Sequence, residues 1–365
     1  RTIYVHSNTT INLAAKTTLI RSGEGVTCNM FRTAPYGVNY SMDGSDSAAI
    51  GAYNMCHDIV LNGASNTTSV LDGGDVWSIQ PTAEDAGRSN VVNFGHSSNI
   101  TINNLFLKNS YSAHLIELAG CKDSKITNCQ FDGSTSRFDN EEALDDHFEA
   151  IQLDICTLDW AGSFKPDKTP CKNITVSGNT IKNYQRGIGN HHTLPGHHNS
   201  GITISNNTIT MTDKKMQHKQ GIYCIGFDNT TVTGNKITGY TISIHVNLST
   251  GVSVTNNTIT NSSDSAIYVN SNSSADAITG NKITNVGLSG ISIGENSSAA
   301  KISGNEITGS AKSAIIVATG KTTEISKNTI HPVKSGYGIS VCGANVTNVT
   351  SNVIETPYAG GISLS

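Results

Sequence analysis

The stretch Val254-Thr-Asn-Asn-Thr-Ile259 identifies the fold, because the same six-residue phrase returns along the chain. The phrase reads apolar, Ser or Thr, any residue, Asn, any residue, apolar. Copies start at residues 176, 204, 232, 254, 278, 302, 325 and 349, and looser copies start at Ile102 and Ile126. The intervals between full copies, 28, 28, 22, 24, 24, 23 and 24 residues, are typical of a repeat protein whose units stack on one another.

A second phrase runs out of phase with the first, as in Ala266-Ile-Tyr-Val-Asn270 and Gly290-Ile-Ser-Ile-Gly294. Both phrases alternate apolar and polar residues, which indicates half-buried strands rather than helices. Such short strands bury their apolar sides only by stacking, so that inward Ile and Val form ladders. We therefore predict an all-β fold, a single right-handed parallel β-helix of about eleven coils over the whole chain. The asparagine at the fourth place of the phrase, from Asn179 to Asn352, is predicted to bond along its own column.

Composition excludes several classes of protein. Only 14% of the 365 residues are charged and the net charge is −4, so we expect no basic surface for nucleic acid. No apolar run approaches the roughly 18–20 residues that span a membrane. The eight cysteines show no Cys-x-x-Cys spacing, which argues against a zinc ribbon. Cys156 and Cys171 are either a disulfide or two free buried thiols, and no cofactor is expected.

Within this one domain (1–365) the regularity varies along the chain. Residues 1–88 are expected to form irregular first coils, 89–240 the coils that carry insertions and a groove, and 241–365 the regular coils. The chain begins at Arg1 rather than at a methionine, so we expect a mature or excised form. It stops within a strand phrase, so we expect a flanking domain or a partner to cover that edge.

The second phrase shows where the repeat is interrupted. The intervals between its inward residues rise to 35, 37 and 34 between Ile116 and Ile222, against 20 to 25 elsewhere. Insertions of this kind are where repeat proteins carry function. The aligned inward residues are Val92, Ile116, Ile151, Ile188, Ile222, Ile242, Ile267, Ile291, Ile315, Ile339 and Ile362.

The three long coils carry unusual side chains beside these inward residues. Strand alternation places Glu117 and Gln152 on one outward column, and Asp154 with His191 on a second. At the strand entries we expect His114, Glu149 and Arg186. The equivalent outward places of the later coils are assigned to Ser243, Ser292, Ile316 and Ser340, which suggest no chemistry. The insertions, with Phe138, Trp160, Phe164 and the histidine-rich loop 191–198, are predicted to wall this face into a groove.

A groove with acids, amides and aromatic rings suits an oligosaccharide or polysaccharide. We predict that Asp154, Glu117 and Glu149 are catalytic, acting as general acid and as base or nucleophile on a glycosidic bond. The α-carbons of Glu117 and Asp154 are expected about 8 Å apart, nearer the spacing of inverting than of retaining enzymes. The predicted substrate-binding residues are His114, Gln152, Arg186, His191, His192, Trp160 and Tyr223.

Each of these features has a simpler interpretation. Outward acids occur on ordinary solvated sheets, and Trp160 suits a buried staple under its loop as well as a sugar platform. The acidic run 139–146 is typical of a solvated loop, with a calcium site as the alternative. The histidine-rich loop suits a sugar contact or a plain loop, with a transition metal as the alternative. No metal site is predicted.

The repeats, with His114-Leu-Ile-Glu117, Glu149-Ala-Ile-Gln-Leu-Asp154 and Arg186-Gly-Ile-Gly189, resemble the β-helical carbohydrate-active proteins of gut and soil bacteria. That group comprises glycoside hydrolases, polysaccharide lyases and epimerases, and the resemblance covers essentially the whole chain. It implies an extracellular or cell-surface protein of a bacterium. Within the group the chain is similar to the lacto-N-biosidase family, which implies cleavage of a β-linked disaccharide with retention by a close aspartate pair. Asp154 with Asp159, or Asp139 with Asp146, are the pairs that the sequence offers.

Two other functions remain open at this point. A polyuronate lyase or epimerase would use Arg186 or a histidine as proton abstractor, but it needs a positive groove, and here one Arg lies among several acids. A non-catalytic glycan-binding adhesin would bind without turnover.

Overall fold

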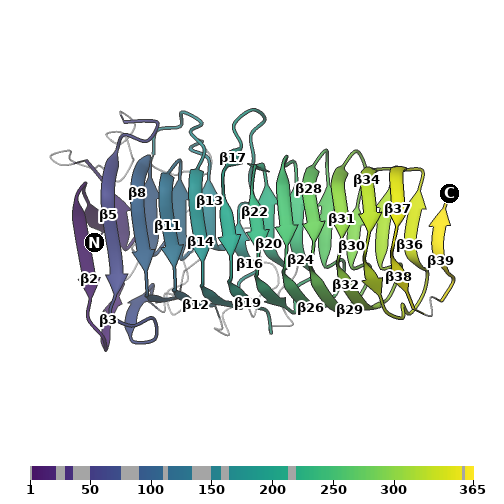
Figure 1. The fold of residues 1–365 in the computed structure, drawn as a ribbon. Helices are drawn as coiled ribbons and strands as arrows, with labels where there is room; N and C mark the ends of the chain where they lie inside the picture. The colour runs from purple at the N-terminus through teal and green to yellow at the C-terminus, as the bar shows by residue number, and fades with distance from the viewer. Residues whose placement is uncertain are drawn as a thin grey trace, which may run out of the picture. The chain divides into compact units, whose positions relative to one another are not determined.

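The computed structural model describes residues 2–21, 29–35, 50–74, 90–109, 114–133, 149–157, 164–212, 219–355 and 358–365. Within these ranges the chain forms 39 β-strands and no helix (Figure 1). Accordingly, this part of the chain contains no apolar helix of membrane-spanning length. The chain divides into two compact units, whose described residues are 2–202 for the N-terminal unit and 203–212 with 219–365 for the C-terminal unit.

The N-terminal unit contains three series of parallel strands, named here sheets A, B and C. Sheet A is formed by β1 (Ile3–Val5), β4 (Phe31–Thr33), β7 (Val92–Gly95), β10 (Ile116–Ala119), β13 (Glu149–Asp154) and β16 (Arg186–Gly189). Sheet B is formed by β2 (Thr9–Leu13), β5 (Cys56–Gly63), β8 (Ser97–Asn103), β11 (Lys122–Thr127), β14 (Lys172–Ser177) and β17 (Asn199–Ser200). Sheet C is formed by β3 (Thr17–Ile20), β6 (Ser69–Asp72), β9 (Phe106–Lys108), β12 (Gln130–Asp132) and β15 (Thr180–Lys182).

The C-terminal unit repeats the same three series. Its sheet A contains β20 (Gln220–Ile225), β24 (Ile242–Asn247), β27 (Ile267–Asn270), β30 (Ile291–Ile293), β33 (Ile315–Ala318), β36 (Tyr337–Cys342) and β39 (Gly360–Leu364). Its sheet B contains β18 (Thr203–Ser205), β22 (Thr231–Thr233), β25 (Val252–Thr255), β28 (Ser274–Thr279), β31 (Ser298–Ser303), β34 (Lys321–Ser326) and β37 (Asn345–Thr350), and β21 (Phe227–Asp228) lies beside this series. Its sheet C contains β19 (Thr208–Thr210), β23 (Lys236–Thr238), β26 (Thr258–Ser262), β29 (Lys282–Val286), β32 (Glu306–Ser310), β35 (Thr329–Ile330) and β38 (Val353–Ile354).

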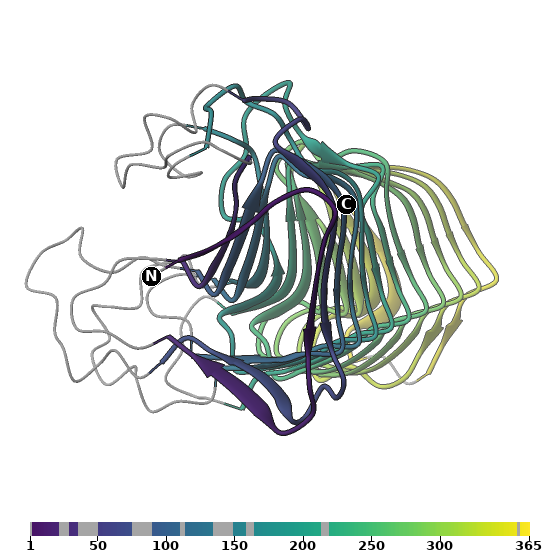
Figure 2. The same cartoon turned by 90° about the vertical axis from the view of Figure 1, so that its left-hand side faces the viewer.

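The predicted parallel β-helix is confirmed in each unit. Consecutive strands of one sheet come from consecutive coils, and Figure 2 shows the turns of the C-terminal unit following one behind the next. Inward residues pair in register, for example Ile267 with Ile291 and Ile291 with Ile315, and all three are fully buried. These stacked Ile and Val columns form the core, as expected for a solenoid that buries its apolar sides between neighbouring coils.

The asparagine ladder is also confirmed in the C-terminal unit. Each amide Nδ2 donates to the Oδ1 of the next asparagine at 2.9–3.0 Å, through Asn207, Asn235, Asn257, Asn281, Asn305, Asn328 and Asn352. The residue before each ladder asparagine has a positive φ, such as 55° at Asn206 and 66° at Gly234. Gly and Asn adopt this left-handed conformation at low cost, which explains why they recur at the third place of the phrase.

One part of the predicted strand alignment is wrong. Ile222 pairs with Ile244, and Ile244 with Ile267, whereas Ile242 pairs with Gln220. The error is two residues, and a shift of two keeps an alternating strand on the same face, so the pattern alone cannot detect it.

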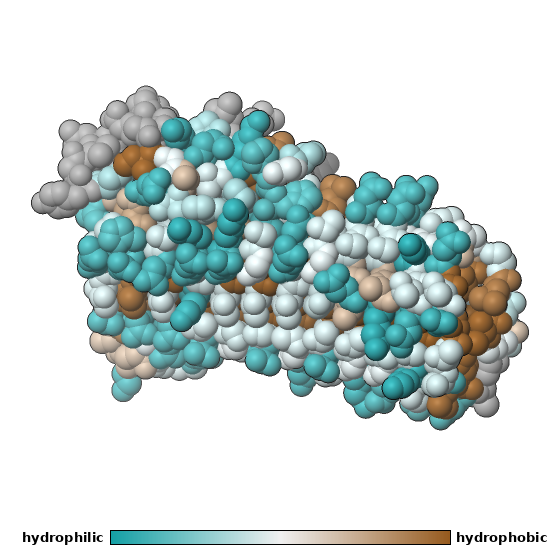
Figure 3. All heavy atoms as spheres, turned by 45° about the horizontal axis from the view of Figure 1, so that its top comes forward, coloured by the Kyte–Doolittle hydropathy of each residue, from teal (hydrophilic) through white to brown (hydrophobic). Residues whose placement is uncertain are grey.

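The last coil of the C-terminal unit exposes apolar side chains, visible as the brown area at the right of Figure 3. They include Val353, Ile362 and Leu364, and Tyr358 in the same coil is also exposed.

Candidate functional site

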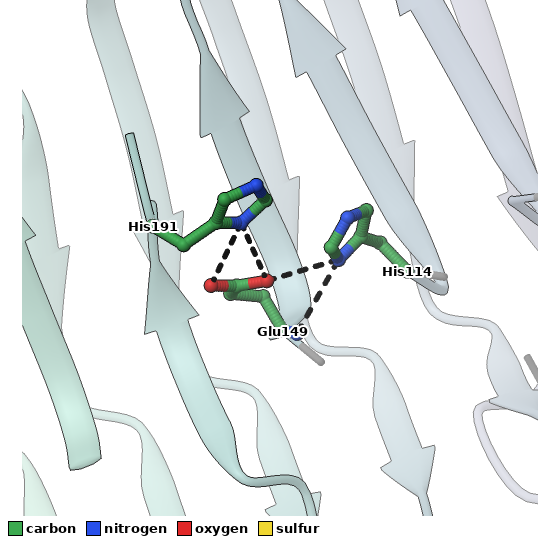
Figure 4. Close-up of side chains that lie close together, drawn as sticks. All are labelled: His114, Glu149 and His191. Atoms are coloured by element: carbon green, nitrogen blue, oxygen red, sulfur yellow. Dashed lines mark hydrogen bonds and ion pairs between the residues drawn. The ribbon is translucent and has the colours of Figure 1, made fainter. Parts of the chain in front are cut away.

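Glu149 is the centre of a buried polar cluster on sheet A of the N-terminal unit (Figure 4). Its Oε2 lies 3.1 Å from Nδ1 of His114, and its Oε1 lies 3.3 Å from Nδ1 of His191. Arg186, its register partner on β16, donates from Nη1 to Oε1 at 3.1 Å. Burial alone would raise the pKa of Glu149, but the hydrogen bonds and charges of the two histidines hold it well below its usual range. Glu149 is therefore ionised.

Glu117 and Asp154 form a second group beside it, on the adjacent strands β10 and β13. Burial and then the charge of Asp154 raise the pKa of Glu117 to about 8. Burial also raises the pKa of Asp154. Asp154 accepts hydrogen bonds from the amide of Ile155 at 2.7 Å and from Nε2 of Gln152 at 3.0 Å, and Glu117 accepts one from Nδ2 of Asn90. Near neutral pH Glu117 is therefore protonated, and the neighbouring Asp154 also has a pKa above its usual range.

The raised pKa of Glu117 has a consequence for stability. The unfolded chain loses this proton near the ordinary value of 4.5, while the folded protein keeps it to about pH 8. The stabilisation is therefore complete below about pH 4.5 and is lost as the pH rises to about 8. We expect Glu117→Gln, which has no proton to lose, to remove most of this decline between pH 5 and 8. Chemical denaturation at a series of pH values measures the free energy of unfolding of both proteins. The same dependence on pH in both would contradict the prediction.

Three buried oxygen atoms lie in a row without a hydrogen-bond partner in the described structure. They are Oδ1 of Asn93, Oε1 of Glu117 and Oε1 of Gln152. Asn93 pairs with Glu117, and Glu117 with Gln152, on adjacent strands. A buried polar atom left without a hydrogen-bond partner costs about 1–3 kcal/mol, so the row lowers the stability of this part of sheet A.

Phe164 covers the end of β7 next to this row. It is 5% exposed, and a Cβ on Gly95 would lie 2.5 Å from its ring carbons, so only glycine fits beneath it. The guanidinium of Arg32 stacks 4.7 Å from the ring centroid. His96 fixes this segment, because its Nε2 lies 2.8 Å from the carbonyl oxygen of Lys165. Of the aromatic residues predicted to wall the groove, Phe164 packs on Gly95, whereas Phe138 and Trp160 lie outside the described residues.

The structure brings together most of the predicted site residues but buries them. Glu117, Glu149, Gln152, Asp154 and Arg186 are at most 5% exposed. The expected arrangement, in which they line an open groove, is therefore wrong for the described residues. The physical reason is that these polar side chains hydrogen-bond to one another, which allows them to be buried.

The position of His191 also differs from the prediction. β16 ends at Gly189, and the side chain of His191 turns to Glu149 instead of continuing the column of Asp154. Asn190 takes that place, with its Nδ2 3.4 Å from Oδ1 of Asp154, and its own Oδ1 accepts from the amides of His191 and His192.

Tyr223, predicted to bind substrate, lies in the C-terminal unit in a stack of rings. Its ring centroid is 4.8 Å from that of His245, which is 5.2 Å from that of Tyr268. His245, not Ser243, therefore occupies the outward place of β24, and the two-residue alignment error at Ile242 concealed it.

Other residues of the site were missed by the sequence reasoning. Asn93 follows Val92 as Glu117 follows Ile116, so extending the column by one coil would have found it. Asn90 and Asn190 lie beyond strand ends, where alternation gives no guidance.

The described cysteines include Cys156 and Cys171, and both are free thiols. Of the two alternatives given by the sequence, the structure therefore has the two free buried thiols and not the disulfide. Burial raises the pKa of Cys171 to about 12, so that thiol is protonated and unreactive.

One group among the described residues has the composition of a metal site. His114, Glu149 and His191 offer ligand atoms that all lie within 4.8 Å of one another. Two imidazoles with one carboxylate suit zinc, copper or a related ion. The sequence pattern places His114 and Glu149 at neighbouring strand entries but assigns His191 to the column of Asp154, so it misses the contact of His191 with Glu149 that completes this group.

Comparisons with known proteins are consistent with this architecture. The model of a family described as periplasmic copper-binding protein (NosD) matches residues 167–294 and 198–365. Plasmin and fibronectin-binding protein A of Streptococcus pneumoniae is 29% identical over 150 residues, which is 39% of this chain and 20% of that protein. The chain thus matches only about a fifth of the length of this relative.

Solved structures share the fold. PfbA, a surface protein and adhesin of Streptococcus pneumoniae, has a TM-score of 0.60 at 17% identity, covering 100% of this chain and 88% of the other. Endo-xylogalacturonan hydrolase from Aspergillus tubingensis has a TM-score of 0.50 at 14% identity, covering 82% and 88%. At these identities the likeness shows the right-handed parallel β-helix and nothing more specific.

Proposed function

The chain belongs to the family described as periplasmic copper-binding protein (NosD), whose members are parallel β-helices, and we propose that it uses this fold to hydrolyse glycosidic bonds outside the cell or at its surface. The observation that carries the proposal is the pair formed by Glu117 and Asp154. Glycoside hydrolysis needs one protonated and one ionised carboxyl group in the same site. The pKa of Glu117, raised to about 8, supplies the proton donor, and Asp154 is the base or nucleophile.

The substrate is a neutral rather than an acidic sugar. The amide oxygen atoms of Asn93 and Gln152 offer acceptors for sugar hydroxyl groups, and the protonated Oε1 of Glu117 offers a donor. Arg186, which a uronate would need, is already paired with Glu149 at 3.1 Å. This pairing disfavours the polyuronate lyase or epimerase. Glu149 then acts as a positioning residue for His114 and His191 rather than as the second catalytic carboxylate.

Binding without turnover is the second candidate. One observation favours it: the chain is 29% identical over 150 residues to a plasmin and fibronectin-binding protein, and it shares its fold with the surface adhesin PfbA. An adhesin of this kind would retain a glycan on the same row of oxygen atoms without cleaving it.

The test is a screen of neutral oligosaccharides for release of reducing ends. Asp154→Asn is expected to lower turnover by about 10²–10⁴-fold, the usual contribution of an acid or base catalyst, with little change in thermal midpoint. Asp276→Asn, an exposed carboxylate on β28, is the matched control and should retain full activity.

Each outcome of this screen separates the candidates. Products that absorb at about 235 nm, the absorbance of an unsaturated uronate formed by proton abstraction, would identify a lyase. Glycan binding without products would identify an adhesin. Full activity of Asp154→Asn would exclude the assigned residue.

A further inference from the structure

We propose that His114, Glu149 and His191 bind one divalent transition-metal ion of the zinc, copper and nickel class. The proposal concerns the cluster around Glu149 and does not depend on whether Glu117 and Asp154 are catalytic. The ligand atoms would be Nδ1 of each histidine and Oε2 of Glu149.

The two distances from the carboxylate oxygen to the imidazole nitrogens are those of neighbouring ligands in a coordination sphere, and all three atoms lie within 4.8 Å of one another. Oε2 of Glu149 lies 3.1 Å from Nδ1 of His114 and 3.4 Å from Nδ1 of His191. With metal–ligand bonds of about 2.0–2.1 Å, adjacent ligands are about 3.0–3.4 Å apart in octahedral to tetrahedral geometry. Figure 4 shows both histidine rings presenting this nitrogen to the same carboxylate.

The site is built before any ion arrives. Its three residues come from consecutive coils of sheet A: His114 just before β10, Glu149 at the start of β13 and His191 just after β16. The two rings are nearly parallel, with centroids 5.8 Å apart and an interplanar angle of 23°. Arg186 holds Oε1 of Glu149 at 3.1 Å, which orients the carboxylate and leaves Oε2 for the ion.

The donor atoms select the class of ion. Calcium and magnesium prefer six or more oxygen ligands, and a site with two imidazoles and a neighbouring guanidinium does not offer them. Imidazole nitrogen suits zinc, copper and nickel. Only His191 lies within the residues that the family model matches, so the site does not follow from the family description.

The experiment measures metal content without any substrate. Protein stripped with EDTA is dialysed against Zn²⁺, Cu²⁺ or Ca²⁺, and bound metal per chain is measured by mass spectrometry. We expect one Zn²⁺ or Cu²⁺ per chain and no Ca²⁺, with a raised thermal midpoint in the loaded protein. In the Cu²⁺ form, electron paramagnetic resonance should show coupling to two nitrogen nuclei.

His114→Ala and His191→Ala are each expected to weaken binding by at least about tenfold. His191→Gln keeps a hydrogen-bond donor for Glu149 and serves if the alanine variants do not fold. His331→Ala, a partly exposed histidine bonded to Glu355 at 2.8 Å, is the control and should bind as the native protein does. The proposal is overturned if the stripped protein takes up no metal, or if His191→Gln binds it as tightly as the native protein. Neither result bears on turnover, which the oligosaccharide screen decides separately.

Discussion

Glu149→Gln is expected to lower the free energy of unfolding by about 3–5 kcal/mol, because it leaves a buried charge without its partner. Arg186 is 5% exposed and donates to Glu149 at 3.1 Å. An amide is isosteric with the carboxylate but carries no charge, so it cannot form the ion pair with Arg186. Urea unfolding followed by circular dichroism at neutral pH measures the change.

The control for this prediction is another acidic residue in an ion pair. Glu306 binds Lys282 at 2.9 Å, but both side chains are exposed. Glu306→Gln should therefore change stability by less than about 1 kcal/mol. Equal effects of the two variants would contradict the buried network. Because the pKa of Glu149 is lowered, its stabilisation is present above the ordinary glutamate pKa and is lost as the pH falls through the lowered value.

Asn281→Ala is expected to lower the free energy of unfolding by about 3–5 kcal/mol, because this one side chain forms hydrogen bonds with several buried groups. Its Oδ1 accepts from the backbone N and from Nδ2 of Asn257, both at 3.0 Å. Its Nδ2 donates at 2.9 Å to the carbonyl oxygen of Val254 and at 2.9 Å to Oδ1 of Asn305. Alanine leaves these partners buried without a hydrogen bond.

Asn348→Ala is the matched control for the ladder. Asn348 lies on β37 and is exposed, so its replacement should change stability by no more than about 0.5 kcal/mol. Thermal and urea unfolding of both variants give the comparison. If the free energy of unfolding of Asn281→Ala lies within about 1 kcal/mol of that of the native protein, the ladder is not a source of stability.

The fold could be predicted from the sequence because each residue type that recurs in the repeat has one conformational role. The asparagines at the fourth place, each after a residue with positive φ that is Gly or Asn in most copies, mark the same corner in coil after coil of the C-terminal unit, which is why the coil spacing is correct there. The alignment failed at Ile242, where Ile244 and Val246 continue the same alternation and the apolar pattern has two equivalent solutions.

The candidate site was predictable along strands and not beyond them. Alternation correctly placed Glu117 beside Gln152, since both lie within regular strands. His191 lies after the end of β16, where the backbone turns, and its contact with Glu149 depends on that turn. The burial of the acids was also missed, because it results from hydrogen bonds among residues of three coils and not from any local pattern.

The asparagine ladder has no built-in length. Each amide bonds to the asparagine one coil away, 22 to 28 residues along the chain, so an added coil would meet the same two neighbours as any other. Tandem duplication of one such stretch of gene would lengthen the protein while leaving the bonding of existing rungs intact. Evolution can in this way vary the size of the solenoid independently of the polar cluster in its N-terminal unit.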